Sequence, residues 1–380
     1  MERYIIALQQ LGIKNDILLR LITQYSFSDI ELIFKDVKNS IFFTDIEFVS
    51  QSSICNDSRN IQTALNYADK IMEKNYELGI KTAVYGRENY PVNLQKIKNS
   101  PVLIYYYGSD IKVESEKAIA CVGTRNPTKL TYNVMNYLIP QLVEEGYTII
   151  SGLALGSDRL AHISCMESGG NTIAVLAHGL DQIFPKKNVR LAEDIIKNGG
   201  TLVSEYAVGI QPEKFRYINR NRLIVGLSRG ILIGECAMKS GTMHSVSFSR
   251  EQKKPIFCTS TITDGGTNQI AAQELIRGQI ATDIPNGRAY DSIVGKTGYK
   301  LSKDRLSVNE IEHLYLKSLI YNLWDNKKIL DDFIVSLSNK NIKIEGLRKD
   351  KYLEILYKNK MPIEELKEKL INLCIENVSE

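Results

Sequence analysis

Residues 148–158, TIISGLALGSD, and residues 172–181, TIAVLAHGLD, decide the fold class of this chain. Each is an apolar run that ends in glycine and small residues, and the same pattern recurs in AIACVGTRN, residues 118–126. Runs without polar alternation are typical of strands buried on both faces, and the intervening stretches have the apolar spacing of helices. This alternation predicts an α/β fold with a doubly wound parallel sheet of about six strands over residues 113–285.

Other regions flank this predicted sheet. Residues 1–75 have apolar residues at helical spacing and a glycine turn, which predicts a helical N-terminal domain. The turn resembles a helix-hairpin-helix or SAM-like module that offers backbone N–H groups to a phosphate, and a helical domain that serves packing alone is the alternative. Residues 76–112 form a connector in which PVLIYYYG is predicted to be a strand. Residues 300–380 are predicted to be a helical C-terminal domain, and Pro140 is expected to kink or end its helix early.

The composition excludes several classes of protein. The 380 residues carry 48 Lys and Arg against 44 Asp and Glu, so a nucleic-acid site has to be a local patch rather than a basic domain. The six cysteines include no C-x-x-C pair, which argues against a zinc knuckle or a redox dithiol. No run approaches the ~18 apolar residues of a membrane span, and no secretory cleavage pattern is visible. We therefore expect a soluble, cytoplasmic protein without membrane contact.

Three predicted strands end in loops suited to a phosphate. They are residues 123–128, 151–158 and 177–181, each rich in glycine or hydroxyl side chains and followed by a predicted helix. In a doubly wound sheet such loops meet at the carboxyl edge, where glycines allow a close backbone approach and helix N-termini attract anions. Arg125 adds a guanidinium fork for bidentate phosphate contact. We expect a phosphate or nucleotide site there, although tight turns alone would also explain the glycines.

Two basic clusters lie next to these loops. One contains Lys186 and Lys187, and the other, residues 214–222, contains four cations and no acid. The aromatic residues Phe184 and Tyr217 are interleaved with them. Cations that follow a backbone, together with aromatic faces, are what single-stranded nucleic acid binding requires. Each cluster alone is equally consistent with a solvated helix face, but their position beside the strand ends favours one groove for an anionic ligand.

Catalytic patterns in the sequence are absent or misplaced. GLSRG, residues 226–230, matches a nucleophile elbow, but it follows a predicted helix and precedes a strand, which inverts the required order. Ser151, Asp158 and His162 are triad residue types, yet the last two lie one turn apart on one helix, so a surface or capping role is expected. No Walker lysine motif, H-E-x-x-H or complete G-x-G-x-x-G fingerprint is present. We predict no catalytic residue, no metal and no cofactor.

Six blocks of the sequence occur in an order known from one family. They are GTRNPT, SGLALGSDRLAH, GGNTIAVLAHGLDQIFPKKN, GTLVSEY, FRYINRNRLIVGLS and KSGTMHSVSFSREQKKPIFC. The chain thereby resembles the DNA-processing protein A family, also called DprA or Smf. The resemblance implies a Rossmann-like domain that binds single-stranded DNA, protects it and loads the RecA recombinase during natural transformation. It also implies a homodimer and no established catalytic activity.

The resemblance assigns DNA and phosphate contacts to particular residues. They are Gly123, Thr124, Arg125, Ser151, Gly152, Gly156, Phe184, Lys186, Lys187, Asn188, Tyr217, Arg220, Asn221, Arg222, Ser240, Gly241 and Thr242. The arginines and lysines of this set are expected to touch phosphates, and one of the two aromatic residues is expected to stack on a base.

Departures from the family pattern keep other functions open. His178 stands where the family has a small residue and is expected to project into the groove, and residues 300–380 do not resemble the winged helix of some members. One alternative is a sensor that binds a small nucleotide in the same groove. Another is a nucleotide hydrolase resembling the lysine-decarboxylase-like LOG family, but the nearest stretch, KSGTMHSVSF, lacks the glutamate of that family's P-G-G-x-G-T-x-x-E block.

Overall fold

The computed structural model describes most of the chain before residue 285. The described ranges are residues 1–36, 39–40, 58–111, 117–259 and 270–284. The predicted C-terminal domain, residues 300–380, lies outside the described residues.

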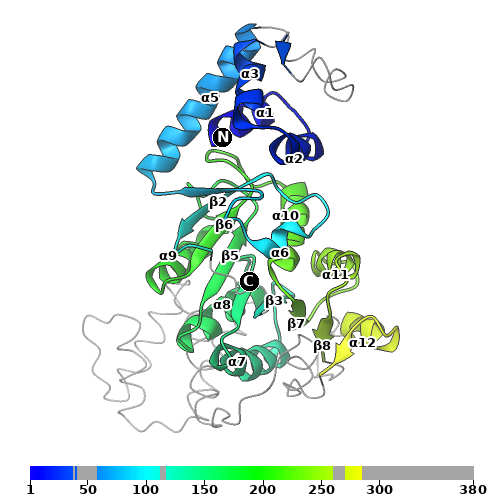
Figure 1. Cartoon of the computed structure of the whole chain (residues 1–380). Helices are drawn as coiled ribbons and strands as arrows, with labels where there is room; N and C mark the ends of the chain where they lie inside the picture. Colours follow the sequence, from blue (N-terminus) through cyan, green and yellow to red (C-terminus); the bar gives the residue numbers. More distant parts are fainter. Residues whose placement is uncertain (37–38, 41–57, 112–116, 260–269, 285–380) are drawn as a thin grey trace, which may run out of the picture.

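One sheet of nine strands forms the centre of the described part of the chain (Figure 1). In chain order the strands are β1 (Lys81–Val84), β2 (Leu103–Gly108), β3 (Ala118–Val122), β4 (Thr148–Ser151), β5 (Thr172–Leu176), β6 (Thr201–Ser204), β7 (Gly230–Ile233), β8 (Ile256–Cys258) and β9 (Thr282–Asp283). Their spatial order is β1-β2-β6-β5-β4-β3-β7-β8-β9. The strands from β6 across to β9 are parallel, while β1 and β2 are antiparallel to their neighbours.

The prediction of a doubly wound parallel sheet is confirmed, and the sheet is larger than expected. The six predicted strands are β3 to β8. The strand predicted in the connector is β2, and it joins the sheet by pairing with β6, with Tyr106 opposite Val203. The chain builds β3 to β6 in one direction and then returns to place β7 on the other side of β3. The switch point therefore lies between β3 and β7, where ligands of open α/β sheets bind.

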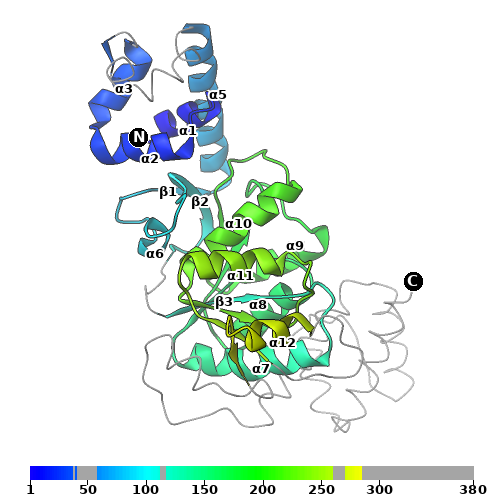
Figure 2. The same ribbon diagram turned by 90° about the vertical axis from the view of Figure 1, so that its right-hand side faces the viewer.

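Helices cover both faces of the sheet. On one face lie α7 (Lys129–Glu144), α8 (Ser157–Glu167) and α9 (Val189–Lys197), and on the other α10 (Lys214–Leu227), α11 (Thr242–Glu251) and α12 (Ile270–Arg277). Figure 2 shows α10 and α11 side by side in front of the sheet. Along β3, Ile119 and Cys121 pack in the core beneath α7, and Ala118, Ala120 and Val122 pack in the core beneath α10. Both faces of the strand are buried, which explains the uninterrupted apolar run.

Pro140 does not end its helix early. The helix α7 continues through Pro140 to Glu144. Pro140 and its neighbours Ile139 and Leu142 are buried in this segment, so packing against the sheet holds a helix that the missing N–H group of proline weakens.

Among the described residues, four helices precede the sheet and lie above it in Figure 1. They are α1 (Glu2–Gln10), α2 (Asn15–Gln24), α3 (Phe27–Lys35) and α5 (Ser58–Glu77). The predicted turn between the first two is present, with Gly12 at φ +80°. The N–H groups of Gly12 and Ile13 both donate to carbonyl oxygens of α1, so they are not available to a phosphate. This favours the interpretation that the turn serves packing.

The N-terminal helices and the sheet share one hydrophobic core. Ile5 and Leu21 belong to the same cluster as Leu103 and Tyr105 of β2. The Asn15 side chain links the start of α2 to the residues before β2. Its amide group donates to the Ser100 carbonyl oxygen at 2.7 Å, and its oxygen accepts from the Val102 N–H at 3.1 Å. The predicted boundary near residue 75 is therefore not a gap in the core.

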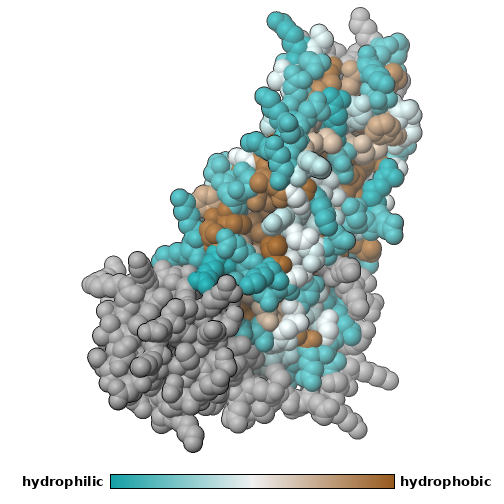
Figure 3. Space-filling model, turned by 90° about the vertical axis from the view of Figure 1, so that its left-hand side faces the viewer, coloured by the Kyte–Doolittle hydropathy of each residue, from teal (hydrophilic) through white to brown (hydrophobic). Residues whose placement is uncertain are grey.

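The surface is mixed in character. Figure 3 shows apolar residues gathered near the middle of one face, with hydrophilic residues above them. Within the described ranges, no helix combines the length and the apolar character that crossing a bilayer requires.

Candidate nucleic-acid interface

The loops predicted to meet do lie along one edge of the sheet. Strands β3, β4 and β5 are parallel neighbours, so the loops that follow them leave from the same carboxyl edge. The predicted site residues of these loops are thus brought together by the topology. The side-chain environments then decide which of them face solvent.

The loop after β3 is fixed on both sides. The Thr124 N–H donates to the Glu235 carbonyl oxygen at 2.7 Å, and the Thr124 carbonyl oxygen accepts from the N–H and the hydroxyl of Ser157, both at 3.0 Å. A Cβ atom on Gly123 would lie 2.4 Å from the Ser157 hydroxyl oxygen, which explains the glycine. The turn leaves Arg125 exposed at the edge of the sheet.

The loop after β4 closes around a buried carboxylate. One oxygen of Asp158 accepts the N–H groups of Gly152 at 3.1 Å and of Ala154 at 3.3 Å. Burial raises the pKa of Asp158, while the charge of Arg220 and the two N–H donors oppose that rise. The expected surface role of Asp158 is wrong, because its side chain is only 6% exposed and stabilises the loop through these buried hydrogen bonds.

This loop lies between two basic segments. On one side, a Cβ on Gly156 would lie 2.4 Å from the Arg125 carbonyl oxygen, so glycine allows the loops after β3 and β4 to touch. On the other side, the Asn188 side chain donates to the Leu153 carbonyl oxygen at 2.7 Å. Asn188 ends the short 3-10 helix η4 (Lys186–Asn188), so the lysine pair is attached to the same loop.

Arg220 lies beneath the loop after β4 rather than at its surface. It is 5% exposed, and its Nη1 donates to the Val175 carbonyl oxygen at 2.6 Å. A Cβ on Gly152 would lie only 1.7 Å from that same Nη1, so the guanidinium packs directly against the glycine backbone. Burial lowers the pKa of Arg220 and the charge of Asp158 raises it. Arg220 therefore packs beneath the loop and adds positive charge there. The expected direct contact of Arg220 with a DNA phosphate is not open in this structure.

Arg222 is engaged in an ion pair. Its guanidinium donates to both carboxylate oxygens of Glu205, at 2.6 and 3.1 Å, and both side chains are largely buried. Glu205 directly follows β6, so the pair joins α10 to the carboxyl edge of the sheet. Arg222 therefore stabilises the position of α10, and its guanidinium is already occupied by Glu205 rather than available to a phosphate.

The remaining residues of α10 and α11 form the flank of the edge. The Asn221 side chain donates to the Gly241 carbonyl oxygen at 3.3 Å, which joins α10 to the residues that open α11. Ser240 is half-buried, Gly241 is exposed and Thr242 is 7% exposed. Tyr217 is half-buried on α10.

His178 does not project into the groove. It is 1% exposed, its ring nitrogen Nδ1 donates to the Gly179 carbonyl oxygen at 2.9 Å, and burial lowers its pKa. Its ring contacts that of Phe184 edge to face, with centroids 5.5 Å apart. His178 thus supports the half-buried Phe184 from the interior.

Three cations at this edge are available to a ligand. Arg125, Lys186 and Lys187 are exposed, and within the described part of the chain their side chains form no ion pair or hydrogen bond. They lie on both sides of the glycine-containing loop after β4. An anionic chain that crosses this loop would meet unpaired positive charge at either end.

Two supporting residues escaped the sequence analysis. Glu235 is fully buried after β7, and one carboxylate oxygen accepts from the Thr128 N–H at 2.8 Å and from the Thr131 hydroxyl at 2.7 Å. Arg159 is 4% exposed and donates to the Asn188 side-chain oxygen at 2.9 Å. The sequence signal for Glu235 was its position two residues after the apolar run of β7, where a buried charge is expected to need several partners.

Comparison with known proteins agrees with this geometry. The model of the family DNA recombination-mediator protein A matches residues 81–287, more than half of the chain. The chain belongs to this family. The match includes the whole sheet from β1 to β9 and every predicted site residue.

Curated members of the DNA recombination-mediator family are similar over the sheet region. Protein Smf of Synechocystis is 40% identical over 172 residues, which is 44% of this chain and 43% of that protein. The DNA processing protein DprA of Streptococcus pneumoniae is 39% identical over 177 residues, 46% of this chain and 62% of that protein. The matched region thus spans about half the length of these curated relatives.

Solved structures of family members share the fold. The structure of DprA from Streptococcus pneumoniae superposes with a TM-score of 0.60 at 24% identity, over 80% of this chain and 99% of the other. The structure of DNA processing protein A from Helicobacter pylori superposes with a TM-score of 0.51 at 27% identity. That structure was described for the single-stranded DNA binding mode of the Helicobacter pylori protein. That likeness extends over 57% of this chain and 96% of the other.

Proposed function

We propose that this member of the DNA recombination-mediator family binds single-stranded DNA along the carboxyl edge of the sheet. The observation that carries the proposal is the position of Arg125 on one side, and Lys186 and Lys187 on the other side, of the loop after β4. All three are exposed, and their side chains have no partner within the described residues. Phosphates that follow this edge would meet each cation in turn.

The neighbouring groups fit a flexible strand better than a compact ligand. Gly123, Gly152 and Gly156 let the loops after β3 and β4 pack closely against each other and against Arg220, which keeps the edge narrow and places the exposed cations near its main chain. Phe184 and Tyr217 are half-buried aromatic residues near this edge, and one stacked base contributes roughly 1–3 kcal/mol. The Helicobacter pylori relative, described for its single-stranded DNA binding mode, supports the same ligand class.

The proposed roles of Arg220 and Arg222 follow from their burial and pairing. Arg220 holds the backbone at Gly152 and adds charge from below, and Arg222 joins α10 to the edge through Glu205. The two arginines therefore act on DNA through the loops that they position. Ser240, Gly241 and Thr242, at the start of α11, form the far flank of the proposed path.

The proposal includes the setting of this activity. We infer that the protein protects incoming single strands and loads RecA onto them in the cytoplasm, as a homodimer and without catalysis, during DNA processing in transformation. The DprA relatives of Bacillus subtilis and Streptococcus pneumoniae support the DNA-processing role.

Fluorescence anisotropy with labelled oligo-dT and oligo-dC strands tests the site. We expect Arg125→Ala and the double variant Lys186→Ala/Lys187→Ala to weaken binding at all base sequences alike, because phosphate contacts carry no base information. Each lost contact reduces the slope of log affinity against log salt by roughly 0.7. Lys197→Ala, which removes an exposed lysine from the last turn of α9, is the matched control.

Three results would contradict the proposal. The first is unchanged affinity and salt slope in the Arg125 and lysine variants. The second is efficient displacement of the oligonucleotide by a mononucleotide at equal phosphate concentration, which would favour the nucleotide-sensor function. Loss of affinity in Lys197→Ala of the same size would show that net charge, rather than this edge, governs binding.

A further inference from the structure

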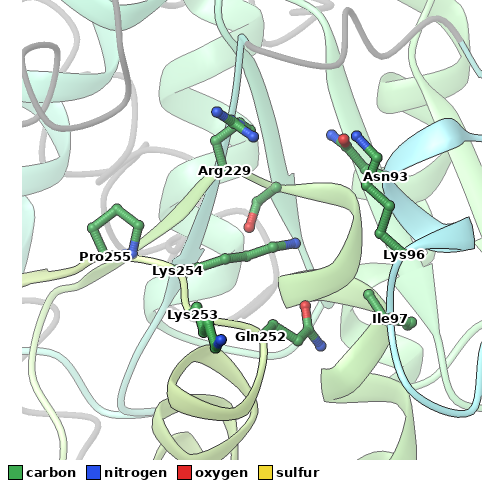
Figure 4. Close-up of a pocket in the computed structure, with 9 residues that line it drawn as sticks. Asn93, Lys96, Ile97, Arg229, Gln252, Lys253, Lys254 and Pro255 are labelled. Atoms are coloured by element: carbon green, nitrogen blue, oxygen red, sulfur yellow. The ribbon is translucent and has the colours of Figure 1, made fainter.

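A second basic site lies at the opposite edge of the sheet. A cavity of about 280 Å³ is formed where the residues before β7 and before β8 face the short helix α6 (Val92–Gln95) and the residue after it (Figure 4). Because β7 and β8 are parallel neighbours, the segments that lead into them share the amino edge. The cavity is therefore separated from the proposed DNA path by the length of the strands.

The lining of this cavity is strongly cationic. Lys96, Arg229, Lys253 and Lys254 line it, and none of its nine lining residues is an acid. Figure 4 shows Lys254 extending across the middle of the cavity toward the wall that carries Asn93 and Lys96. The nearby acid Glu251 is outside the lining, and its carboxylate lies 3.8 Å from the ammonium group of Lys98. The cavity thus concentrates positive charge without a compensating carboxylate in its wall.

A structural role accounts for only one of these cationic side chains, that of Lys254. The ammonium group of Lys254 donates to the carbonyl oxygens of Val225 at 2.6 Å and Gly226 at 2.8 Å, which satisfies the C-terminus of α10. One of its three N–H groups is left over. Lys96 and Arg229 are exposed, and among the described residues their side chains form no ion pair or hydrogen bond. Capping of α10 therefore does not account for the two further cations.

The cations act on one another. Burial is the main cause that lowers the pKa of Lys254, and together with the charges of Arg229 and Lys96 it brings that pKa to about 7. Mutual repulsion of this kind is relieved by an anion between the groups. A guanidinium fork beside ammonium groups is the donor set that proteins use for phosphate. The cavity is at the lower end of the size range of ligand sites, which suits a phosphate group rather than a large cofactor.

We propose that this amino-edge cavity binds a phosphate group, held by Lys96, Arg229 and Lys254. The phosphate belongs either to a small ion or ester in solution or to the backbone of a DNA strand that continues around the molecule. The site goes beyond the proposed DNA path, because it shares no residue with it.

Calorimetric titration of the full chain with inorganic phosphate tests this site. We expect saturable binding to one site per chain, and at least a tenfold loss of affinity in Lys96→Gln/Arg229→Gln. Both side chains are exposed and unpaired among the described residues, so the variant is expected to fold. Lys70→Gln/Lys74→Gln removes the same charge from exposed residues of α5 outside the cavity and is expected to bind like the wild type.

Oligo-dT binding over a salt series distinguishes the two sources of phosphate. If a DNA backbone occupies the cavity, the cavity variant lowers the salt slope by roughly 1.4, from two lost contacts at ~0.7 each. If the ligand is a small phosphate, the slope is unchanged while phosphate binding is lost. Absence of saturable phosphate binding to the wild type, or equal losses in the cavity and control variants, overturns the proposal. The variants Arg125→Ala and Lys186→Ala/Lys187→Ala test the proposed DNA path without changing the cavity. Either proposal can therefore fail while the other holds.

Discussion

At the scale of single residues, the surroundings of a cation decide what it can bind. Arg125 and Arg220 belong to the same edge of the sheet, but Arg125 is exposed while Arg220 is 5% exposed and bonded to the Val175 carbonyl oxygen. Desolvating a guanidinium is costly, so a buried one is kept only where backbone and carboxylate groups receive it. Asp158 supplies the opposite charge at this site.

The contact between Gly152 and Arg220 predicts a sharp cost of adding one methyl group. In Gly152→Ala the new Cβ would lie 1.7 Å from Nη1 of Arg220, so the guanidinium or the loop has to move. We expect the free energy of unfolding to fall by about 1–3 kcal/mol, as for other overpacked sites. Urea denaturation measures it. Gly241→Ala is the control, because no atom lies within 4 Å of a Cβ built there, and a similar loss in both variants would contradict the argument.

The buried His162 predicts a dependence of stability on pH. Its Nδ1 lies 2.7 Å from the Thr172 hydroxyl, and burial lowers its pKa to about 3 from an ordinary value of 6.5. Between pH 6.5 and 3 the unfolded chain binds a proton there and the folded chain does not. The His162 contribution to the free energy of unfolding therefore falls as the pH drops through this window, by up to about 1.4 kcal/mol per unit.

Urea denaturation of wild type and His162→Gln at several pH values isolates this contribution. We expect the stability difference between the two proteins to narrow as the pH falls from 6.5 toward 4. A difference that stays constant over that range would show that His162 carries a proton in the folded state.

At the scale of elements, single polar side chains join pieces that are far apart in sequence. Arg222 joins α10 to the end of β6 through Glu205, and Asn188 joins η4 to the loop after β4. Asn15 joins α2 to the start of β2. Each link satisfies buried or half-buried polar groups, and removing one partner leaves the other desolvated without a bond.

The Asn15 link predicts a measurable cost of its removal. Asn15→Ala leaves the Ser100 carbonyl oxygen and the Val102 N–H without this partner, and we expect a loss of about 1–3 kcal/mol in the free energy of unfolding. The matched control is Asn66→Ala on the exposed face of α5, where the amide oxygen only accepts from Gln62 one turn away. Equal stability of Asn15→Ala and wild type would contradict the role of this link.

At the scale of the whole molecule, two ligand edges are proposed on opposite sides of one sheet. The carboxyl edge has exposed cations beside glycine loops, and the amino edge has a cationic cavity beside the C-terminus of α10. The parallel strands from β6 to β9 lie between the two edges. The N-terminal helices extend the same core beyond β2.

The shared core predicts cooperative unfolding of the N-terminal helices and the sheet. Ile5 of α1 is fully buried in the cluster that also contains Leu103 of β2. Ile5→Ala is expected to cost about 2–5 kcal/mol and to lower protection from hydrogen exchange in α1 and β2 together. Loss of protection in α1 alone, with β2 unchanged, would show that residues before 75 unfold as a separate unit.

Local pattern was enough to predict the sheet and much of its edge. Continuous apolar runs fix β3 to β8 as strands buried on both faces, and the glycines after β3 and β4 mark the turns that meet there. These features depend on near neighbours in the chain, because hydrophobic burial and turn geometry are set by residue type and spacing. Arg125 and the lysine pair were predicted as cations of this edge, and their contact with phosphate stays a proposal.

Long-range packing decided what local pattern left open. Arg220 and Arg222 look as available as Arg125 in the sequence, but a distant carbonyl group and Glu205 engage them in the folded chain. The pairing of β2 with β6 joins residues more than ninety positions apart, and the amino-edge cavity is formed by segments more than a hundred residues apart. Residue type determined which groups are cationic and which segments are apolar. Only the tertiary structure decided which charges are desolvated and paired, because burial and ion pairing depend on neighbours that the chain brings in from afar.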